Sequence, residues 1–204
     1  DAPLIETVAR FYTGEDFGKL TRSIVGKREG FSEVLDRDAV FGLFGQTSDL
    51  TGQQIESSVF LGSEAALFES IIPHLLAKGG NDQKAGKTLA AFDMFDLSGL
   101  PALEKLFLFQ GGKTPFAAKV DSFPTKPTRK LIADDMVALD NLMMRVEDAR
   151  NARLSLMAVQ KTLALHHFAR AFLRRYQTAK EKRGWLDFDD LILKARALLN
   201  DKQV

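Results

Sequence analysis

The sequence predicts an all-α fold, an irregular multi-helix domain with one long basic helix. Apolar residues recur mostly at spacings of three and four, which places them on one face of a helix. Glycine, proline and short polar residues separate these apolar runs, as turns between helices would. Residues 133–183 contain neither glycine nor proline, so no strong helix breaker lies within that stretch.

The first eighty residues are expected to form short packed helices. The first apolar helix face would consist of Leu4, Val8, Phe11 and Tyr12. Further helices, each bounded by glycine or turn residues, are expected over residues 16–24, 32–44, 51–62 and 63–78. Ser63 is the expected N-cap of the last of these helices, and Gly79 with Gly80 would end it.

Helical periodicity weakens between residues 81 and 130. One helix is expected over residues 82–94, and residues 107–109 fit either a short strand or the end of a helix from Ala102. Closely spaced turn formers follow, namely Gly99, Pro101, Gly111, Gly112, Pro115, Pro124 and Pro127. Residues 111–130 are therefore expected to form an exposed basic loop.

Residues 133–183 are expected to form the long helix. About 50 residues rising about 1.5 Å each would give a rod of roughly 75 Å, which exceeds a compact domain. A bend or break is therefore expected near residues 148–151, where charged residues interrupt the apolar stripe. Gly184 is the expected C-terminal stop.

The composition is that of a folded protein. The 204 residues are 45% hydrophobic and 27% charged, which suits one domain with a core, or one domain with a protruding arm. No apolar run reaches the roughly 18–20 residues of a bilayer span, and the N-terminus lacks the pattern of a secretion signal. The absence of cysteine excludes disulfides, thiolate metal ligands and cysteine nucleophiles. A cytoplasmic location without membrane partners is the default expectation.

The net charge of +1 conceals two oppositely charged halves. Residues 1–100 carry 9 Lys/Arg against 15 Asp/Glu, a charge of −6, whereas residues 101–204 carry 19 against 12, a charge of +7. A polyanion is expected to bind the second half. Candidate DNA-binding side chains, chosen because their charges cluster, are Lys113, Lys119, Lys126, Arg129, Lys130, Arg170, Arg174 and Arg175.

The most informative motif lies between Phe168 and Leu199, where a helix with a Tyr and a Lys leads into Leu-Asp-Phe-Asp-Asp-Leu. It resembles the segment of UvrD-like superfamily 1 helicases that returns from an inserted helical subdomain, 1B, to the first motor domain. The matching residues are Tyr176, Lys180, Leu186, Asp187, Phe188, Asp189, Asp190, Leu191, Ala195 and Leu199.

Features outside this motif resemble one branch of that superfamily. The Phe-rich helices, Gly79–Gly80 followed by Asp82, and the Lys-rich loop before the long helix are similar to the AddA subunit of bacterial helicase-nucleases. Such enzymes act in double-strand break repair and recombination. The resemblance implies that residues 1–183 form a 1B-like insertion and residues 184–204 the return segment.

The same resemblance implies cofactors and partners. The parent would be an ATP-dependent DNA helicase with exonuclease activity that uses ATP and magnesium, whereas this piece would bind neither. Its partners would be duplex DNA without sequence preference, the rest of the helicase chain and an AddB-like subunit. The family's ATP-binding loop would precede residue 1 and its Asp-Glu motif would follow residue 204, so the chain is expected not to hydrolyse ATP.

The motif also has a physical interpretation that is independent of the family. Asp187 suits an N-cap, and Asp190 lies three residues on. The positive end of a helix stabilises both carboxylates. Losing such a cap costs about 1 kcal/mol. We interpret the three aspartates as a capped helix start and not as a metal site. The buried stripe of the following helix is expected to be Phe188, Leu191, Ile192, Ala195 and Leu198.

No catalytic or metal site is predicted. Gly86-Lys87-Thr88 resembles the end of a phosphate-binding loop, but Asn81 stands where that motif requires glycine. Gly112-Lys113-Thr114 fails in the same way, because Phe107 occupies that position and Pro115 follows. His166 and His167 point about 100° apart on a helix, without the second histidine of a helical zinc pair. Ser155 has no recognisable triad partners.

Two functions follow from these observations. In the first, the chain is an accessory subdomain that grips duplex DNA near the fork through Lys and Arg contacts to phosphate. In the second, it is a helical protein-interaction module that docks on a partner subunit or the rest of its parent chain without binding DNA. Each basic residue could instead simply solvate a helix face. A contact surface is expected to be exposed around residues 185–199.

Overall fold

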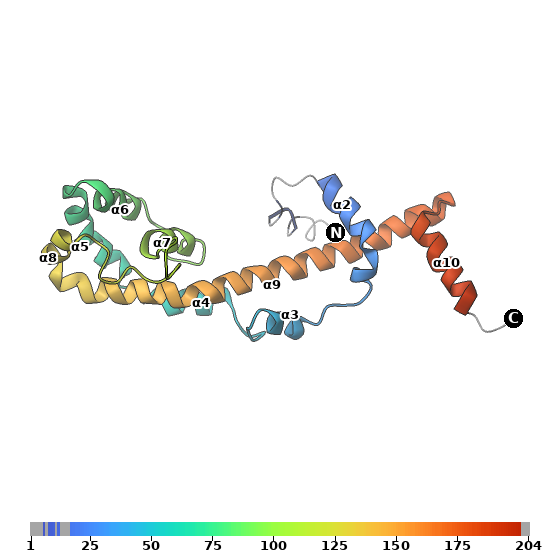
Figure 1. Cartoon of the computed structure of the whole chain (residues 1–204), viewed down its shortest axis with the longest axis horizontal. Coiled ribbons are helices and arrows are strands. Elements are labelled where there is room, and N and C mark those ends of the chain that lie inside the picture. Colours follow the sequence, from blue (N-terminus) through green and yellow to red (C-terminus); the bar gives the residue numbers. More distant parts are fainter. Residues whose placement is uncertain (1–5, 7, 11, 13–16, 201–204) are drawn as a thin grey trace. The chain divides into compact units, whose positions relative to one another are not determined.

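The all-α prediction is confirmed by the computed structural model, which describes residues 6, 8–10, 12 and 17–200 (Figure 1). The described residues contain no β-strand, and their β pairing is limited to an isolated bridge between Leu108 and Ala118. The chain divides into two compact units. Unit 1 comprises residues 1–37 and 160–204, and unit 2 comprises residues 38–159. The helix α9 (Met136–Arg183) contributes residues to both units.

Unit 1 is built from α2 (Phe17–Gly26), the short helix η1 (Arg28–Phe31), the second part of α9, and α10 (Phe188–Asn200). Helix α2 confirms the helix predicted over residues 16–24, apart from Asp16, which lies outside the described residues together with Leu4 and Phe11. A small apolar core joins α2 to α9 and contains Val8, Ile24, Ala164, Phe168 and Ala169. The Phe17 ring meets the Phe168 ring edge-on, with centroids 5.4 Å apart.

Unit 2 contains the larger core. Its elements are α3 (Arg37–Leu43), α4 (Gly52–Val59), α5 (Glu64–Ala77), α6 (Gly80–Ala90), α7 (Leu100–Phe107), α8 (Lys126–Leu131), η2 (Ala133–Asp135) and the first part of α9. The apolar stripe of α9 faces this core with Leu139, Leu142, Met143 and Val146, all essentially buried. No single described helix is long and apolar enough to cross a membrane; α4 and α5 meet that test only as a pair bent by 51°.

A side-chain cap fixes the start of α4, whereas α5 begins without one. Thr51 accepts from the backbone N–H of Gln54 at 3.2 Å, and the Gln54 side chain accepts from the Thr51 N–H at 2.7 Å, which completes a capping box. Ser63 stands at the predicted N-cap of α5, but its side chain makes no capping hydrogen bond. The buried carboxylate of Glu64, the first residue of α5, accepts from the N–H groups of Leu61 and Gly62 in the turn before the helix.

Several predicted boundaries in unit 2 were wrong. The helix predicted over residues 32–44 forms only at Arg37–Leu43, and the one predicted over residues 82–94 spans Gly80–Ala90. Gly79 and Gly80 do not end α5 directly, because α5 ends at Ala77 and Gly80 is the first residue of α6. Phe107 ends α7, and Leu108 enters the isolated bridge. Each discrepancy is a boundary shift of the kind that local pattern cannot resolve.

The predicted basic loop over residues 111–130 is partly helical and partly buried. Residues 126–131 form α8, and Thr128 at its centre is fully buried. The Asp82 carboxylate accepts from the hydroxyls of Thr125 and Thr128, both at 2.6 Å, and from the Thr125 N–H at 3.1 Å. This carboxylate lies in the first turn of α6 and meets the N-terminus of α8, so two helix dipoles stabilise its charge.

The break predicted near residues 148–151 does not occur, since α9 is continuous from Met136 to Arg183. The charged residues there serve tertiary contacts. Glu104 of α7 accepts two hydrogen bonds from the Arg153 guanidinium, at 2.6 and 2.7 Å, and Arg150 lies 3.8 Å from the same carboxylate. Ala149, just before Arg150 in the sequence, is buried. The apparent interruption of the stripe is therefore a contact surface for α7.

Candidate nucleic-acid interface

A groove of about 480 Å³ in unit 1 brings together three arginines. Arg28 comes from η1, and Arg170 and Arg174 come from successive turns of α9. The other lining residues are Glu29, Phe31, Ser32, Leu173, Tyr176 and Gln177. We call this site the arginine groove. Guanidinium groups with nearby hydroxyl, amide and aromatic side chains can donate to phosphate oxygens and contact a sugar or base.

A second basic hollow lies along the same part of α9. Arg174, Arg175, Thr178, Ala179 and Lys182 line about 380 Å³. Arg174, Thr178 and Lys182 are four positions apart in succession, as are Arg175 and Ala179, so these residues share one helix face. Of the candidate DNA-binding residues, Arg170, Arg174 and Arg175 thus lie within two adjoining concave surfaces of unit 1.

Beside the groove, a cluster of charges ties α9 to α10 and η1. The Arg28 guanidinium donates to both carboxylate oxygens of Asp187, at 2.9 and 3.0 Å. Lys180, only 4% exposed, donates to Asp187 at 2.7 Å and also pairs with Asp190. The hydroxyl of Tyr176 lies 3.5 Å from Asp187. The structure thus brings Tyr176, Lys180, Asp187 and Asp190 together, and it adds Arg28. We call these five residues the junction cluster.

The charges in this cluster perturb one another. The hydrogen bonds from Arg28, and to a lesser extent those from Lys180, hold the pKa of Asp187 well below its usual range despite its burial. The hydrogen bond from Lys180 likewise lowers the pKa of Asp190. Burial lowers the pKa of Lys180, but its bonds to Asp187 and Asp190 outweigh this effect, and the net shift is upward. Asp187, Asp190 and Lys180 therefore carry their charges near neutral pH.

Local sequence explains the geometry of the elbow between α9 and α10. Gly184 adopts a positive φ of 65°, and the N–H groups of Gly184 and Trp185 bond to the carbonyls of Glu181 and Lys180. This is a Schellman ending, which confirms Gly184 as the helix stop. Asp187 accepts from the N–H of Asp190, and Asp190 accepts from the N–H of Asp187, both at 3.0 Å. The predicted capped start is confirmed as a reciprocal pair.

His166 is a buried titratable group in the core of unit 1. It is 5% exposed, its ring centroid lies 5.6 Å from that of Phe31, and its Nδ1 has no hydrogen-bond partner among the described residues. Burial, and secondarily the charges of Arg170 and His167, lower the pKa of His166. The structure therefore favours the neutral ring.

This environment predicts a pH dependence of unit 1. The pKa of His166 in the folded state is below the unfolded value of about 6.5. Its contribution to the stability of unit 1 is therefore complete above about pH 6.5 and is lost on acidification. The midpoint of unfolding of unit 1 should decrease as the pH is lowered from about 7.5 to about 5.5, a range in which carboxylates are still ionised. His166→Phe should reduce that fall. His167→Gln should change it only slightly, because the charge of His167 is a secondary cause of the lowered pKa of His166.

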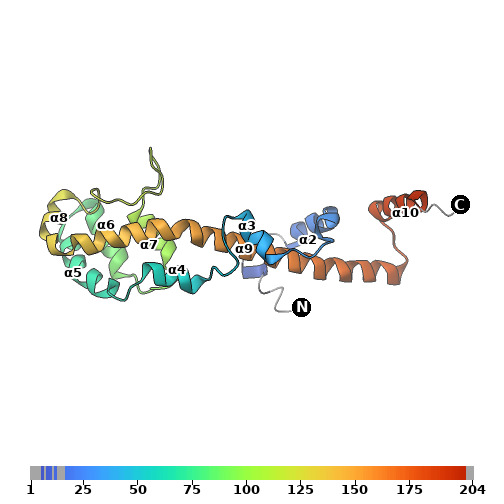
Figure 2. The same ribbon diagram turned by 90° about the horizontal axis from the view of Figure 1, so that it is seen from below.

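The candidate DNA-binding residues of unit 2 differ in exposure and in whether they already have hydrogen-bond or ion-pair partners. Lys113, Lys126 and Lys130 are exposed, and Figure 2 shows the connection between α7 and α8 projecting from unit 2. In contrast, the Lys119 ammonium donates to the carbonyl of Leu106 at 2.7 Å. Arg129 donates to the carbonyl of Phe123 at 2.9 Å and pairs with Asp140 at 3.1 Å. Lys119 and Arg129 therefore have structural partners.

A comparison with protein-family models matches residues 53–204, about three quarters of the chain, to the UvrD/REP helicase N-terminal domain. The chain belongs to the UvrD/REP helicase family. The match includes the elbow and the junction cluster except Arg28. Comparisons with curated proteins and with solved structures give no match.

Both Gly-Lys-Thr sequences lie among the described residues, and neither fits a phosphate-binding loop. Gly86-Lys87-Thr88 lies in the middle of α6, where backbone N–H groups belong to the helix and cannot cradle a phosphate. Gly86 is buried, and a Cβ at this position would lie 3.0 Å from Leu75. Gly112-Lys113-Thr114 lies in the connection after α7, and no helix begins there.

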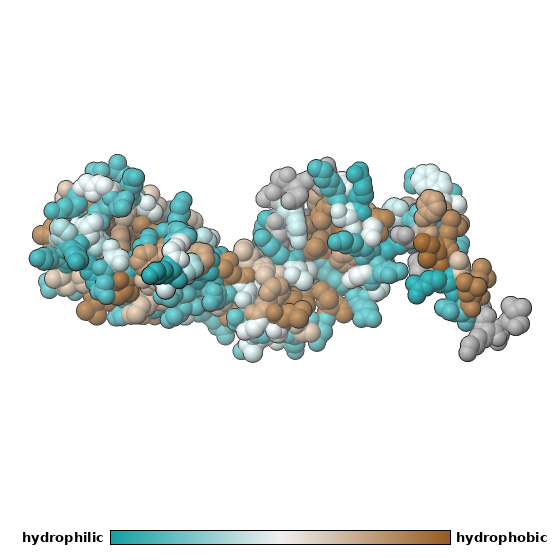
Figure 3. Space-filling model, viewed as in Figure 1, coloured by the Kyte–Doolittle hydropathy of each residue, from teal (hydrophilic) through white to brown (hydrophobic). Residues whose placement is uncertain are grey.

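The predicted buried stripe of α10 in this UvrD/REP chain was wrong. Among the described residues nothing covers that face, and Phe188, Leu191, Ile192 and Leu198 are 84%, 51%, 56% and 77% exposed. Trp185 and Leu186 are exposed as well, and the hydrophobic colouring of α10 is visible in Figure 3. The surface expected around residues 185–199 is thus confirmed as exposed. The side chain of Asp189 lies outside the described part of the chain.

Arg28 is the residue that sequence interpretation missed. It lies in the acidic half of the chain, 159 positions before Asp187, its partner in two hydrogen bonds. No local sequence pattern around Arg28 predicts its pairing with Asp187. Its neighbours Lys27 and Glu29 are charged as well, and only the fold shows that Arg28 reaches the elbow.

Proposed function

We propose that this UvrD/REP chain is a DNA-contacting accessory part of an AddA-type helicase-nuclease, comparable to subdomain 1B, that acts in double-strand break repair and recombination. It would grip duplex DNA near the fork while motor domains elsewhere in the parent use ATP and magnesium. The arginine groove is the observation that carries this proposal. Its guanidinium groups would donate to phosphates without reading sequence.

Charge and family support this proposal from two directions. The family match and the elbow motif support a helicase, and the surplus of positive charge in residues 101–204 supports a polyanionic partner. Arg170 and Arg174 line the groove on the side of α9, whereas Arg28 is held by the junction cluster. The two α9 arginines would therefore supply the adaptable phosphate contacts, and Arg28 a fixed one.

Duplex binding measured by fluorescence anisotropy across a salt series tests this function. The log of the affinity should fall with log salt by about 0.9 for each phosphate contacted. Arg170→Gln with Arg174→Gln should weaken binding about tenfold at about 50 mM salt and reduce the slope by about 2. Arg22→Gln removes an exposed charge of the same unit outside the groove and serves as the control. Unchanged affinity and slope in the double variant would refute phosphate contact by this groove.

The exposed face of α10 supports a second candidate function, a protein-interaction module without DNA binding. Phe188 and Leu199, 84% and 85% exposed, are costly to leave in water. In this alternative α10 would dock on the rest of the parent chain or on an AddB-like subunit. Light scattering or cross-linking that finds a stoichiometric protein complex, together with no DNA binding, would favour it. Phe188→Asp should then abolish the complex.

A further inference from the structure

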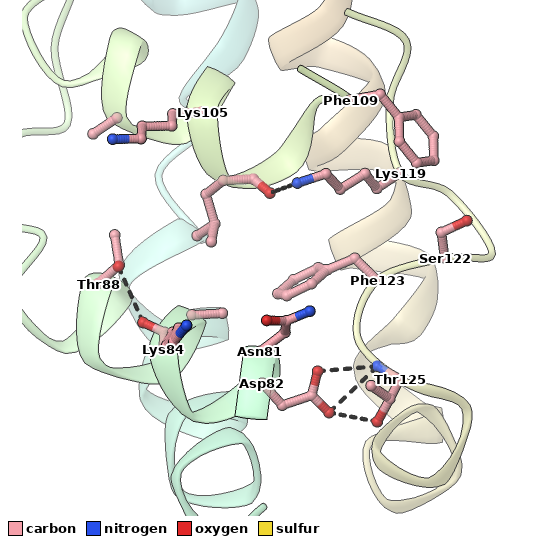
Figure 4. A pocket seen from close by; sticks show the side chains of 13 residues that line it. Asn81, Asp82, Lys84, Thr88, Lys105, Phe109, Lys119, Ser122, Phe123 and Thr125 are labelled. Atoms are coloured by element: carbon pink, nitrogen blue, oxygen red, sulfur yellow. Dashed lines mark hydrogen bonds between the residues drawn. The ribbon is translucent and has the colours of Figure 1, made fainter. Parts of the chain in front are cut away.

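A hollow of about 560 Å³ in unit 2 is lined by three lysines from three separate elements (Figure 4). Lys84 comes from α6, Lys105 from α7 and Lys119 from the connection between α7 and α8. Asn81, Thr88 and Ser122 add polar groups at the same wall. We call this site the lysine hollow. Its volume is within the range of about 300–1,000 Å³ that small-molecule sites occupy.

The positive charge of the hollow is not neutralised from within. Asp82 is the one acidic residue in its lining, and this carboxylate is 1% exposed and already accepts from Thr125 and Thr128. The side chains of Lys84 and Lys105 have no hydrogen-bond or ion-pair partner among the residues that the structure describes. An anion would therefore meet an excess of donors.

Lys119 contributes a partly desolvated charge. Its ammonium donates to the Leu106 carbonyl at 2.7 Å, which occupies one of its three N–H groups. Burial lowers the pKa of Lys119, which means that the protein solvates this charge less well than water does. An anionic ligand would offset that loss, because attraction between opposite charges strengthens where water is excluded.

The rest of the wall is apolar. Ala85, Ala102, Leu106 and Phe123 line the hollow between the lysines. Inorganic anions gain nothing from such a surface, whereas a ligand with an anionic group and a flat, weakly polar body would bury that body against it. Amide and hydroxyl groups such as Asn81 and Ser122 can pair with the edge of a base or a sugar hydroxyl.

We propose that the lysine hollow binds a nucleotide through its terminal phosphate, either as a free mononucleotide or as the phosphorylated end of a nucleic-acid strand. The phosphate lies among Lys84, Lys105 and Lys119, and the nucleoside rests on the apolar wall. The hollow lies in unit 2 and shares no residue with the arginine groove of unit 1, so binding there does not depend on the proposed function.

Titration of the whole chain with deoxyadenosine monophosphate, followed by calorimetry at low salt, tests this site. Saturable binding is expected, and deoxyadenosine or inorganic phosphate alone should bind at least about tenfold more weakly. Lys84→Gln with Lys105→Gln should weaken binding at least about tenfold. Lys87→Gln is the matched control, because Lys87 is exposed on the same helix and does not line the hollow.

Short oligonucleotides with and without a 5′-phosphate distinguish the two sources. Tighter binding of the phosphorylated strand than of the mononucleotide, lost in the Lys84 and Lys105 double variant, assigns a strand end. Equal or weaker binding of the strand assigns a free nucleotide. No saturable binding at millimolar nucleotide, or equal loss in Lys87→Gln, would overturn the proposal. The Arg170 and Arg174 variant should retain nucleotide binding, so failure of the groove and failure of the hollow are separable.

Discussion

Replacing Phe107 with alanine is expected to lower the free energy of unfolding of unit 2 by about 3–5 kcal/mol. The Phe107 side chain is fully buried at the end of α7, and its ring centroid lies 5.7 Å from that of Phe123 and 6.5 Å from that of Phe68. Truncation removes apolar burial and leaves a cavity. The walls are held apart by other contacts, such as the bonds between Glu104 and Arg153, so collapse into the cavity is limited.

Urea unfolding measures this loss, and amide hydrogen exchange should locate it in α5, α7 and the first part of α9. Phe107→Leu keeps most of the volume and should cost less than about 1.5 kcal/mol. Phe44→Ala is the matched control, since the Phe44 ring is 38% exposed and its loss should cost no more than about 1 kcal/mol. Equal losses for Phe107→Ala and Phe44→Ala would contradict the packing described for α7.

Asp187→Ala is expected to lower the stability of unit 1 by about 2–4 kcal/mol, less than the roughly 3–5 kcal/mol of a fully buried pair because Asp187 is partly exposed. The substitution removes the N-cap of α10 and both acceptors of the Arg28 guanidinium. It also removes one of the two carboxylate partners of the buried Lys180, which then pairs only with Asp190. Hydrogen exchange should increase in α10, η1 and the end of α9, while unit 2 stays protected.

Asp187→Asn separates the two roles of this residue. Asparagine is as good an N-cap as aspartate, so only the loss of charge should be measured, and the variant should fall between the wild type and Asp187→Ala. A double-mutant cycle with Arg28→Gln should give a coupling energy of about 1–3 kcal/mol. A coupling near zero would show that Arg28 and Asp187 do not stabilise each other.

The pH dependence of the same cluster has a defined sign. The folded pKa values of Asp187 and Asp190 are lowered, so their contribution is complete above the unfolded value of about 3.9 and is lost as the pH falls toward the folded values. The folded pKa of Lys180 is raised, so its contribution is complete below about pH 10 and is lost above that. Asp187→Ala should therefore flatten the acid limb of the stability curve of unit 1.

Much of the fold was predictable because the buried face and the ends of a helix depend on residues only a few positions apart. The spacing of Leu139, Leu142 and Val146 predicted the buried face of α9, and Gly184 predicted its end. Asp187 and Asp190 predicted a capped start, which the structure contains as two hydrogen bonds of 3.0 Å. The positively charged half of the chain predicted where arginines would gather, although contact with DNA remains a prediction.

Other features required the tertiary structure, because their partners are far apart in the chain and no periodicity connects them. Asp82 accepts from Thr128 of α8, 46 positions away, and Glu104 accepts from Arg153 of α9, 49 positions away. The spacing of α10 likewise did not decide whether its apolar face is buried: amphipathic spacing shows which face of a helix is apolar, but whether another surface covers it depends on the neighbours that the fold provides.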